Sequence, residues 1–192
     1  MDIDQFDYPL RKELIAQEPL RVRSNSRLLV DLGEETKHLK ISDLPDFLTP
    51  GDLLVLNNTR VLPARLKTFK STGGEVEVLL LEQTDNSSEW KALVRPSRRI
   101  KEGSVFNFGD DFRIVVNQDL GEGIRNVHLD ADPDLVGVLE KYGEMPLPPY
   151  IENRIENQER YQTVYSQRPA SVAAPTAGLH LTNELLEKCL QK

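Results

Sequence analysis

The apolar positions divide the chain into a central part in which they alternate with polar ones and flanking parts in which they do not. Between about residues 63 and 127, short alternating stretches are separated by glycine, asparagine or aspartate. Period-two alternation interrupted by turn residues predicts the antiparallel strands of a small barrel or sandwich. The expected strands are Glu75–Leu81, Trp90–Val94, Gly103–Phe108, Phe112–Val116 and Ile124–Leu129.

Three further stretches have a clear pattern. Leu135, Leu139 and Tyr142 recur at helical spacing and predict a helix that stops at Gly143. Thr182–Lys192 is typical of a second helix. Leu53–Leu56 is an unbroken apolar run, which predicts a strand buried on both faces.

Composition is that of a soluble globular protein, with 39% hydrophobic and 29% charged residues among 192. The net charge of −7 argues against nucleic-acid binding through bulk charge. Two clusters of cations nevertheless contain no acidic residue. Such clusters are either solvated turns or contacts for phosphates. They are Arg60, Arg65, Lys67 and Lys70, and Lys91, Arg95, Arg98, Arg99 and Lys101.

The cysteine and histidine content argues against a metal centre or a disulfide. The single cysteine, Cys189, excludes an internal disulfide, and the three histidines stand far apart in sequence. We therefore expect no metal. No apolar run is long enough to span a bilayer, and the first residues are acidic, unlike a secretory signal. We expect a cytoplasmic location.

The stretch from Ser171 to Thr182 combines small residues with candidate chemistry. Pro175 and Gly178 let the backbone approach a ligand closely, while Thr176 supplies a hydroxyl and His180 a group that titrates near neutrality. The alternative is a small-residue strand that crosses a tight packing site. Asn57–Arg60 directly follow the apolar run and are either ligand contacts or turn formers.

Several common site motifs are absent from the sequence. There is no Walker-type phosphate loop, and Gly121-Glu122-Gly123 lacks the strand and helix context of a dinucleotide fingerprint. No nucleophile elbow of the G-x-S-x-G kind occurs. Hydrolases and nucleotide triphosphatases of the familiar types are therefore not supported.

Five stretches of the chain form long motifs of low degeneracy. They are Ser26–Val30, Leu53–Arg60 with Pro63–Leu66, Gly143–Ile151, Arg160–Tyr165 and Ser171–His180. Together and in this order they closely resemble the S-adenosylmethionine:tRNA ribosyltransferase-isomerases of queuosine biosynthesis. The resemblance runs from Phe6 to Lys192, and agreement of that extent is not expected by chance.

The resemblance implies a fold and a reaction. The implied fold is an irregular, mixed-sheet α/β domain, residues 1–62 and 148–192, interrupted by an inserted small antiparallel β-barrel, residues 63–147. The implied reaction moves the ribosyl group of S-adenosylmethionine, a co-substrate, onto 7-aminomethyl-7-deazaguanine at the wobble position of a tRNA. The product is epoxyqueuosine, and adenine and methionine leave.

Residue chemistry suggests roles within that reaction. His180 is the candidate for proton handling and Thr176 for orienting the substrate. Contacts to S-adenosylmethionine are expected from residues 57–60, namely Asn57, Asn58, Thr59 and Arg60, and from Pro175 and Gly178. Contacts to tRNA phosphates are expected from Arg65, Arg95, Arg98, Arg99 and Lys101.

Members of the family continue well past the position of Lys192, so the chain is expected to be a C-terminally shortened, partial α/β domain. Three functions follow. The chain is a working enzyme completed by a separate chain, an inactive N-terminal fragment that still binds tRNA, or a β-barrel module reused for another ligand. A monomer is expected apart from that second chain.

Overall fold

The computed structural model describes residues 2–33, 35–70, 73–131, 134–153 and 157–192. The chain groups into two compact units: unit 1 comprises residues 1–53, 147–160 and 180–192, and unit 2 comprises residues 54–146 and 161–179. The domain boundaries expected from the resemblance stay a prediction.

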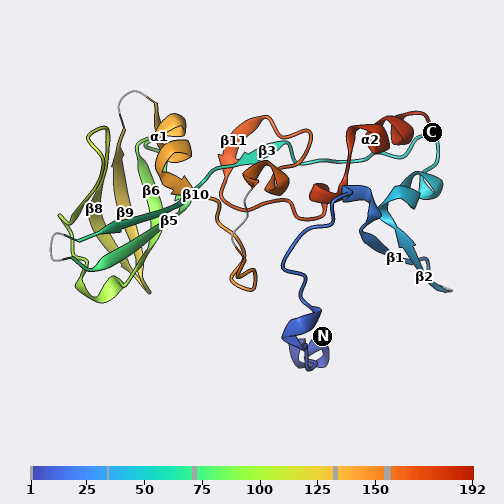
Figure 1. The fold of residues 1–192 in the computed structure, drawn as a ribbon, viewed down its shortest axis with the longest axis horizontal. Coiled ribbons are helices and arrows are strands. Elements are labelled where there is room, and N and C mark those ends of the chain that lie inside the picture. Colours follow the sequence, from blue (N-terminus) through green and yellow to red (C-terminus); the bar gives the residue numbers. More distant parts are fainter. Residues whose placement is uncertain (1, 34, 71–72, 132–133, 154–156) are drawn as a thin grey trace. The chain divides into compact units, whose positions relative to one another are not determined.

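The described residues contain strands, two α-helices and several 3-10 turns, labelled as in Figure 1. The strands are β1 Arg27–Asp31, β2 Thr36–Lys40, β3 Thr59–Val61, β4 Arg65–Phe69, β5 Glu75–Gln83, β6 Glu89–Arg95, β7 Val105–Phe108, β8 Phe112–Gly121, β9 Ile124–Asp130, β10 Gly143–Glu144 and β11 Arg168–Ser171. The helices are α1 Leu135–Tyr142 and α2 Asn183–Leu190. The 3-10 turns are η1 Ile3–Phe6, η2 Lys12–Leu14, η3 Arg23–Asn25, η4 Ile41–Phe47, η5 Ser97–Arg99, η6 Gln158–Tyr161 and η7 Gly178–His180.

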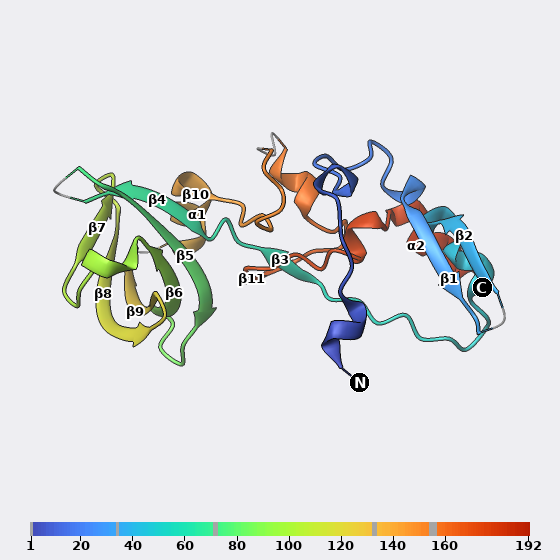
Figure 2. The ribbon, with the colours of Figure 1, turned by 90° about the horizontal axis from the view of Figure 1, so that it is seen from below.

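Unit 2 is built on a seven-stranded antiparallel sheet in the order β10-β4-β5-β6-β9-β8-β7. The sheet curls strongly, as Figure 2 shows. The hydroxyl of Thr68 in β4 donates to the carbonyl of Asn107 in β7 at 3.2 Å, so the edge strand β7 comes within side-chain reach of β4, the second strand from the opposite edge. The protein is thus a mixed α/β structure whose main body is a half-barrel.

Alternation along the strands produces the core of this sheet. In β5, Val76, Val78 and Leu80 are fully buried, and the residues between them face outward. Strands β6, β7, β8 and β9 follow the same period and supply most of the remaining buried apolar side chains. Each of the five strands expected in the central part is therefore confirmed, although β8 runs further than expected.

Both predicted helices are present, and local signals fix their ends. Helix α1 buries Val138 and Leu139 against the sheet core and ends at Gly143, whose N–H donates to the carbonyl of Leu139. Helix α2 begins after Thr182, whose hydroxyl accepts from the N–H of Leu185 at 3.2 Å. The threonine cap accounts for the start of α2, and α1 ends where the backbone becomes extended at Gly143.

Unit 1 is held by a hairpin, the helix α2 and an N-terminal arm. Strands β1 and β2 pair antiparallel, with Leu28 opposite Leu39. Helix α2 packs on η4, where Pro45 and Leu185 are buried. The side-chain amide of Gln17 donates to the carbonyl of Tyr150 at 2.9 Å and accepts from the N–H of Glu152 at 2.8 Å. These two bonds tie the N-terminal arm, residues 2–25, to residues 147–152.

The prediction of a buried strand at Leu53–Leu56 is wrong. These residues form no strand, and Leu53 and Val55 are 86% and 81% exposed. The strand forms instead at Thr59–Val61. A run can be buried on both faces only where strands flank it, and within the described part of the chain no strand pairs with residues 53–56.

Candidate functional site

Residues 57–60 lie against the segment that precedes the small-residue stretch. Strand β3 pairs in parallel with β11, with Arg168 opposite Thr59. The carbonyl of Asn58 accepts from the N–H groups of Gln167 and Arg168 at 2.8 and 3.3 Å. The side chain of Asn57 accepts from the N–H of Thr59 at 2.9 Å, which shapes the entry to the strand. Residues 57–60 therefore meet, within unit 2, the segment that leads into the small-residue stretch.

A buried glutamine fixes the far end of β3. Gln162 is only 4% exposed and bonds both ways with Val61, accepting from its N–H at 2.9 Å and donating to its carbonyl at 2.8 Å. Such a paired amide acts as one further rung of the sheet. The hydroxyl of Thr59 is buried and has no hydrogen-bond partner among the described residues. The segment therefore holds one covered polar group whose hydrogen-bonding capacity is unused in the described residues.

The turn at residues 175–178 is formed by backbone hydrogen bonds and by a close approach. The N–H of Gly178 donates to the carbonyl of Pro175 at 2.9 Å. Gly178 is buried, and a Cβ there would meet the hydroxyl of Tyr165 and the methyl of Thr163. Thr176 is exposed at the outside of this turn. The small residues here thus permit packing and also leave a hydroxyl available to a ligand.

His180 belongs to unit 1, where its neighbours are cations. Burial lowers the pKa of the imidazole, and the charges of Arg160 and Arg23 lower it further. Both arginines are fixed by backbone carbonyls: Arg160 donates to that of Leu20 at 2.5 Å and Arg23 to that of Glu159 at 3.1 Å. The imidazole is therefore kept neutral at pH 7 and can accept a proton.

Replacing Arg160 by glutamine is expected to raise the pKa of His180, because one of the two neighbouring positive charges is lost. The value should remain below that of an exposed histidine, since burial persists. NMR titration of the imidazole protons measures both values. Arg21→Gln, an exposed arginine in the same unit, is the matched control and should leave the titration unchanged. An unaltered midpoint in Arg160→Gln would contradict this electrostatic account.

The second cation cluster forms a loop at the rim of the seven-stranded sheet, here called the cationic loop, residues 95–101. Arg95 ends β6, Arg98 and Arg99 lie in η5, and Lys101 follows the buried Ile100. All four cationic side chains are exposed, and in the described residues none forms an ion pair. Their charges are therefore available to an anionic partner.

Arg65 is placed differently from the cationic loop. It lies half-buried in β4, and its guanidinium contacts the carboxylate of Glu77 at 3.3 Å. A surface hollow of about 840 Å³ is lined by Arg65, Arg95, Arg98 and the carboxylates of Glu75 and Glu77. The hollow is thus of mixed charge, and the unpaired positive charge lies on its loop side.

Sequence reasoning missed three side chains that organise these regions. They are Gln162, which pairs with β3, Arg23 beside His180, and Arg125, described below. Arg125 had a visible signal, because it occupies the same inward register in β9 as Val127 and Leu129. A charged residue at an inward position requires buried partners.

The described residues lack two kinds of feature, a cluster of metal ligands and a membrane-spanning helix. The described residues contain no group of three or more histidine, cysteine, aspartate or glutamate side chains placed to hold a metal ion. None of the helices that the structure describes has the length and apolar character needed to cross a membrane.

The sequence was compared with known proteins. Residues 3–192 match the family described as Queuosine biosynthesis protein. The chain is 49% identical over 198 residues to an S-adenosylmethionine:tRNA ribosyltransferase-isomerase of Staphylococcus epidermidis, and 48% identical over 194 residues to that of Staphylococcus saprophyticus. These alignments cover 100% and 98% of the chain, but 57% and 56% of the relatives.

Among solved structures, the chain is similar to an S-adenosylmethionine tRNA ribosyltransferase of Thermotoga maritima. The identity is 32%, and the match covers 98% of this chain and 54% of the other, with a TM-score of 0.36. The chain therefore spans little more than half the length of the proteins it matches.

Proposed function

The chain belongs to the queuosine biosynthesis protein family, and on that premise we propose that it is part of an S-adenosylmethionine:tRNA ribosyltransferase-isomerase. The proposed reaction moves the ribosyl group of S-adenosylmethionine onto 7-aminomethyl-7-deazaguanine at the tRNA wobble position, giving epoxyqueuosine and releasing adenine and methionine. The observation that carries the proposal is the match to relatives of that name over the whole chain at nearly half identity. A cytoplasmic location and an inserted β-barrel domain form part of the proposal.

The chemistry requires a proton acceptor and a neutral amine. The sulfonium of S-adenosylmethionine acidifies the hydrogens at C5′ of the ribose, so a base must take a proton there. A neutral imidazole at His180 has a free nitrogen lone pair for this proton, although the burial and the two arginines that lower its pKa also make it a weaker base. Thr176, exposed on its turn, is proposed to orient the substrate.

The pairing of β3 with β11 is proposed to present the polar contacts for S-adenosylmethionine. Arg60 is half-buried in β3, and the unpartnered hydroxyl of Thr59 and the amides of Asn57 and Asn58 are close to it in sequence. Pro175 and Gly178 would line one side of the proposed S-adenosylmethionine site. The fit of a hydroxyl and amides to the ribose and amino-acid groups of the substrate supports this assignment.

The cationic loop is proposed to bind tRNA phosphates through Arg95, Arg98, Arg99 and Lys101. Arg65 would assist only after exchanging its carboxylate partner. Phosphate neutralisation by unpaired cations supplies affinity that falls steeply with salt. The local concentration of positive charge reconciles tRNA binding with a net charge of −7.

Turnover is proposed to need the further residues that the relatives carry, since the chain covers 57% and 56% of their length. The bare apolar run at Leu53–Leu56 favours this, because a buried strand needs neighbours. The alternative is a chain that binds tRNA without turnover, which the unpaired cationic loop also supports.

Adenine release provides the test of this proposal. We expect the purified chain, incubated with S-adenosylmethionine and a tRNA that carries the modified precursor base, to release adenine only when the remaining C-terminal part of a relative is added. His180→Ala in the same mixture should abolish release while leaving tRNA binding intact. Salt-dependent tRNA binding without adenine release under any of these conditions would establish the alternative.

A further inference from the structure

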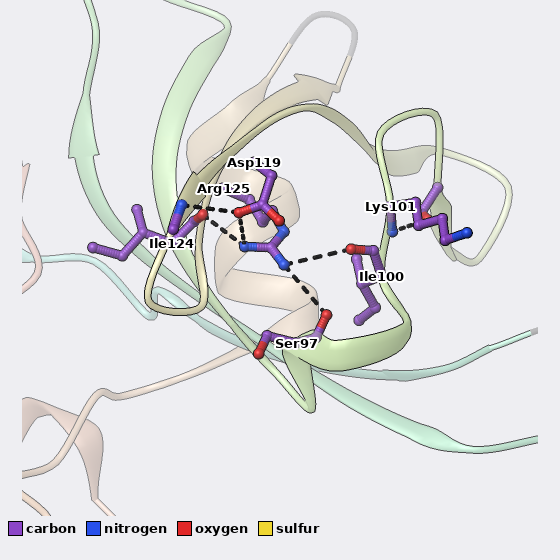
Figure 3. A network of polar contacts seen from close by, with 8 residues as sticks. Ser97, Ile100, Lys101, Asp119, Ile124 and Arg125 are labelled. Carbon is purple, nitrogen blue, oxygen red and sulfur yellow. Dashed lines mark hydrogen bonds and ion pairs between the residues drawn. The ribbon is translucent and has the colours of Figure 1, made fainter.

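The cationic loop rests on a buried arginine. Arg125, near the start of β9, is 4% exposed. Its Nη2 donates to the carbonyl of Ser97 at 3.3 Å and contacts that of Ile100 at 3.5 Å, so the guanidinium reaches both ends of η5 (Figure 3). The turn that carries Arg98 and Arg99 is thus held from inside.

The other edge of the same guanidinium is fixed to the β8–β9 hairpin. Nη1 donates to the carboxylate of Asp119 at 2.6 Å and to the carbonyl of Ile124 at 2.8 Å (Figure 3). The hairpin turn has three consecutive residues with positive φ, Gly121, Glu122 and Gly123, which bring Asp119 back beside Arg125. One side chain therefore joins the hairpin to the loop.

Only a guanidinium can make this set of bonds. It presents several donors in one rigid plane, whereas an ammonium is a single point with three donors. A buried charge is tolerated only where it is paired and hydrogen-bonded, and here a carboxylate and three carbonyls are the partners of Nη1 and Nη2. The buried Nε has no partner among the described residues.

The bonds also determine which way the loop faces. Because the carbonyls of Ser97 and Ile100 turn toward Arg125 and the Ile100 side chain is buried, the backbone of η5 is fixed with its cations outward. Arg98, Arg99 and Lys101 are all exposed and without ion pairs among the described residues. The turn's own bond, from the N–H of Ile100 to the carbonyl of Ser97 at 3.1 Å, completes the arrangement.

We infer that Arg125 is a positioning residue that holds the cationic loop in the geometry that binds nucleic-acid phosphates. This inference rests on the proposed tRNA-binding function. Arg125 itself touches no phosphate, because its side chain is covered, so its effect on binding passes through the loop.

The test replaces Arg125 by glutamine or lysine in the whole chain and reads two properties. Loop order is measured by the rate of tryptic cleavage after Arg98, Arg99 and Lys101 without RNA, and binding by the affinity for a tRNA transcript over a series of salt concentrations. For Arg125→Gln we expect about tenfold faster cleavage at these sites. The slope of log affinity against log salt should fall by about 2, since each lost phosphate contact removes about 0.9.

Arg113→Gln is the matched control. Arg113 lies in β8 of the same sheet, is exposed, and pairs with Asp130 at 2.6 Å, so its loss removes the same charge without touching the loop. In Arg113→Gln, cleavage in the loop should stay at the wild-type rate. The slope of log affinity against log salt should differ from that of the wild type by no more than about 0.9, the value for one phosphate contact.

Arg125→Lys separates charge from geometry and covers the case in which the glutamine variant does not fold. Lysine keeps the positive charge but cannot span Asp119 and both loop carbonyls, so cleavage should still rise and the slope still fall. Wild-type cleavage and slope in Arg125→Lys would overturn the inference. If the unaltered chain does not bind tRNA, the proposed function fails. Equal rates of loop cleavage in the wild type and in the Arg125 variants would overturn the positioning role of Arg125, whether or not the chain binds tRNA.

Discussion

Replacing Arg98, Arg99 and Lys101 together by glutamate is expected to weaken tRNA binding about a hundredfold at physiological salt. Each reversal turns an attraction to a phosphate into a repulsion, which after screening amounts to roughly a fivefold loss per site. The three side chains are exposed and lack ion pairs in the described residues, so reversal breaks no internal contact. A filter-binding titration against a tRNA transcript at fixed salt measures the loss, and a melting curve verifies the fold.

The matched control reverses three exposed lysines of unit 1, Lys12, Lys37 and Lys188. It changes the net charge by the same amount and leaves the cationic loop intact. Affinity should then fall less than tenfold, because charges that contact no phosphate act on the tRNA only through attraction that salt screens beyond about 8 Å. Equal losses in the two triple variants would mean that bulk charge, and not the loop, governs binding.

Gly143→Ala is expected to destabilise unit 2 by about 3 kcal/mol, at the upper end of the usual cost of overpacking. A Cβ at Gly143 would overlap the carbonyl oxygen of Pro63 and lie 2.6 Å from that of Leu139. Both are backbone atoms, so no side chain can rotate away. Relief requires β10 to separate from β4, and with it the end of α1 to move off the sheet core.

Urea unfolding followed by the fluorescence of Trp90 reports this loss. Trp90 is the chain's single tryptophan and lies 5% exposed in β6 of the same sheet. Gly74→Ala is the control, since a Cβ there meets only the Lys70 side chain at 3.9 Å. It should change the free energy of unfolding by less than about 0.5 kcal/mol. Similar midpoints for the two variants would refute the steric argument.

Most of the half-barrel could be predicted from the sequence because most of its strands show a clear alternation of apolar and polar residues. The alternation of apolar and polar residues in β5 and β9 predicts which side chains face the core, even when the neighbouring strands are unknown. The same logic failed at Leu53–Leu56. An unbroken apolar run does not indicate which side chains face the core or how the strand aligns with its neighbours. Its burial therefore depends on neighbouring strands that the run itself does not identify.

The candidate site was predictable in its residue types more than in its arrangement. Gly178 and His180 predict close approach of the backbone to another group and proton transfer. In the structure, the group that packs closely against Gly178 is the side chain of Tyr165. The cations near His180 are Arg23 and Arg160. None of these three neighbours lies within residues 171–182. Long-range pairing of this kind follows from the fold, which one sequence does not reveal locally.

The division of the chain into compact units has a kinetic consequence. The seven strands of the half-barrel and helix α1 occupy one uninterrupted stretch, residues 65–144, whereas unit 1 draws on three separate segments. During synthesis from the N-terminus, the half-barrel can close as soon as residue 144 has left the ribosome. Residues 1–53 must then wait for residues 147–160 and 180–192 of the same unit, so the β1–β2 hairpin, although made earlier, is stabilised by its unit only after the half-barrel can close.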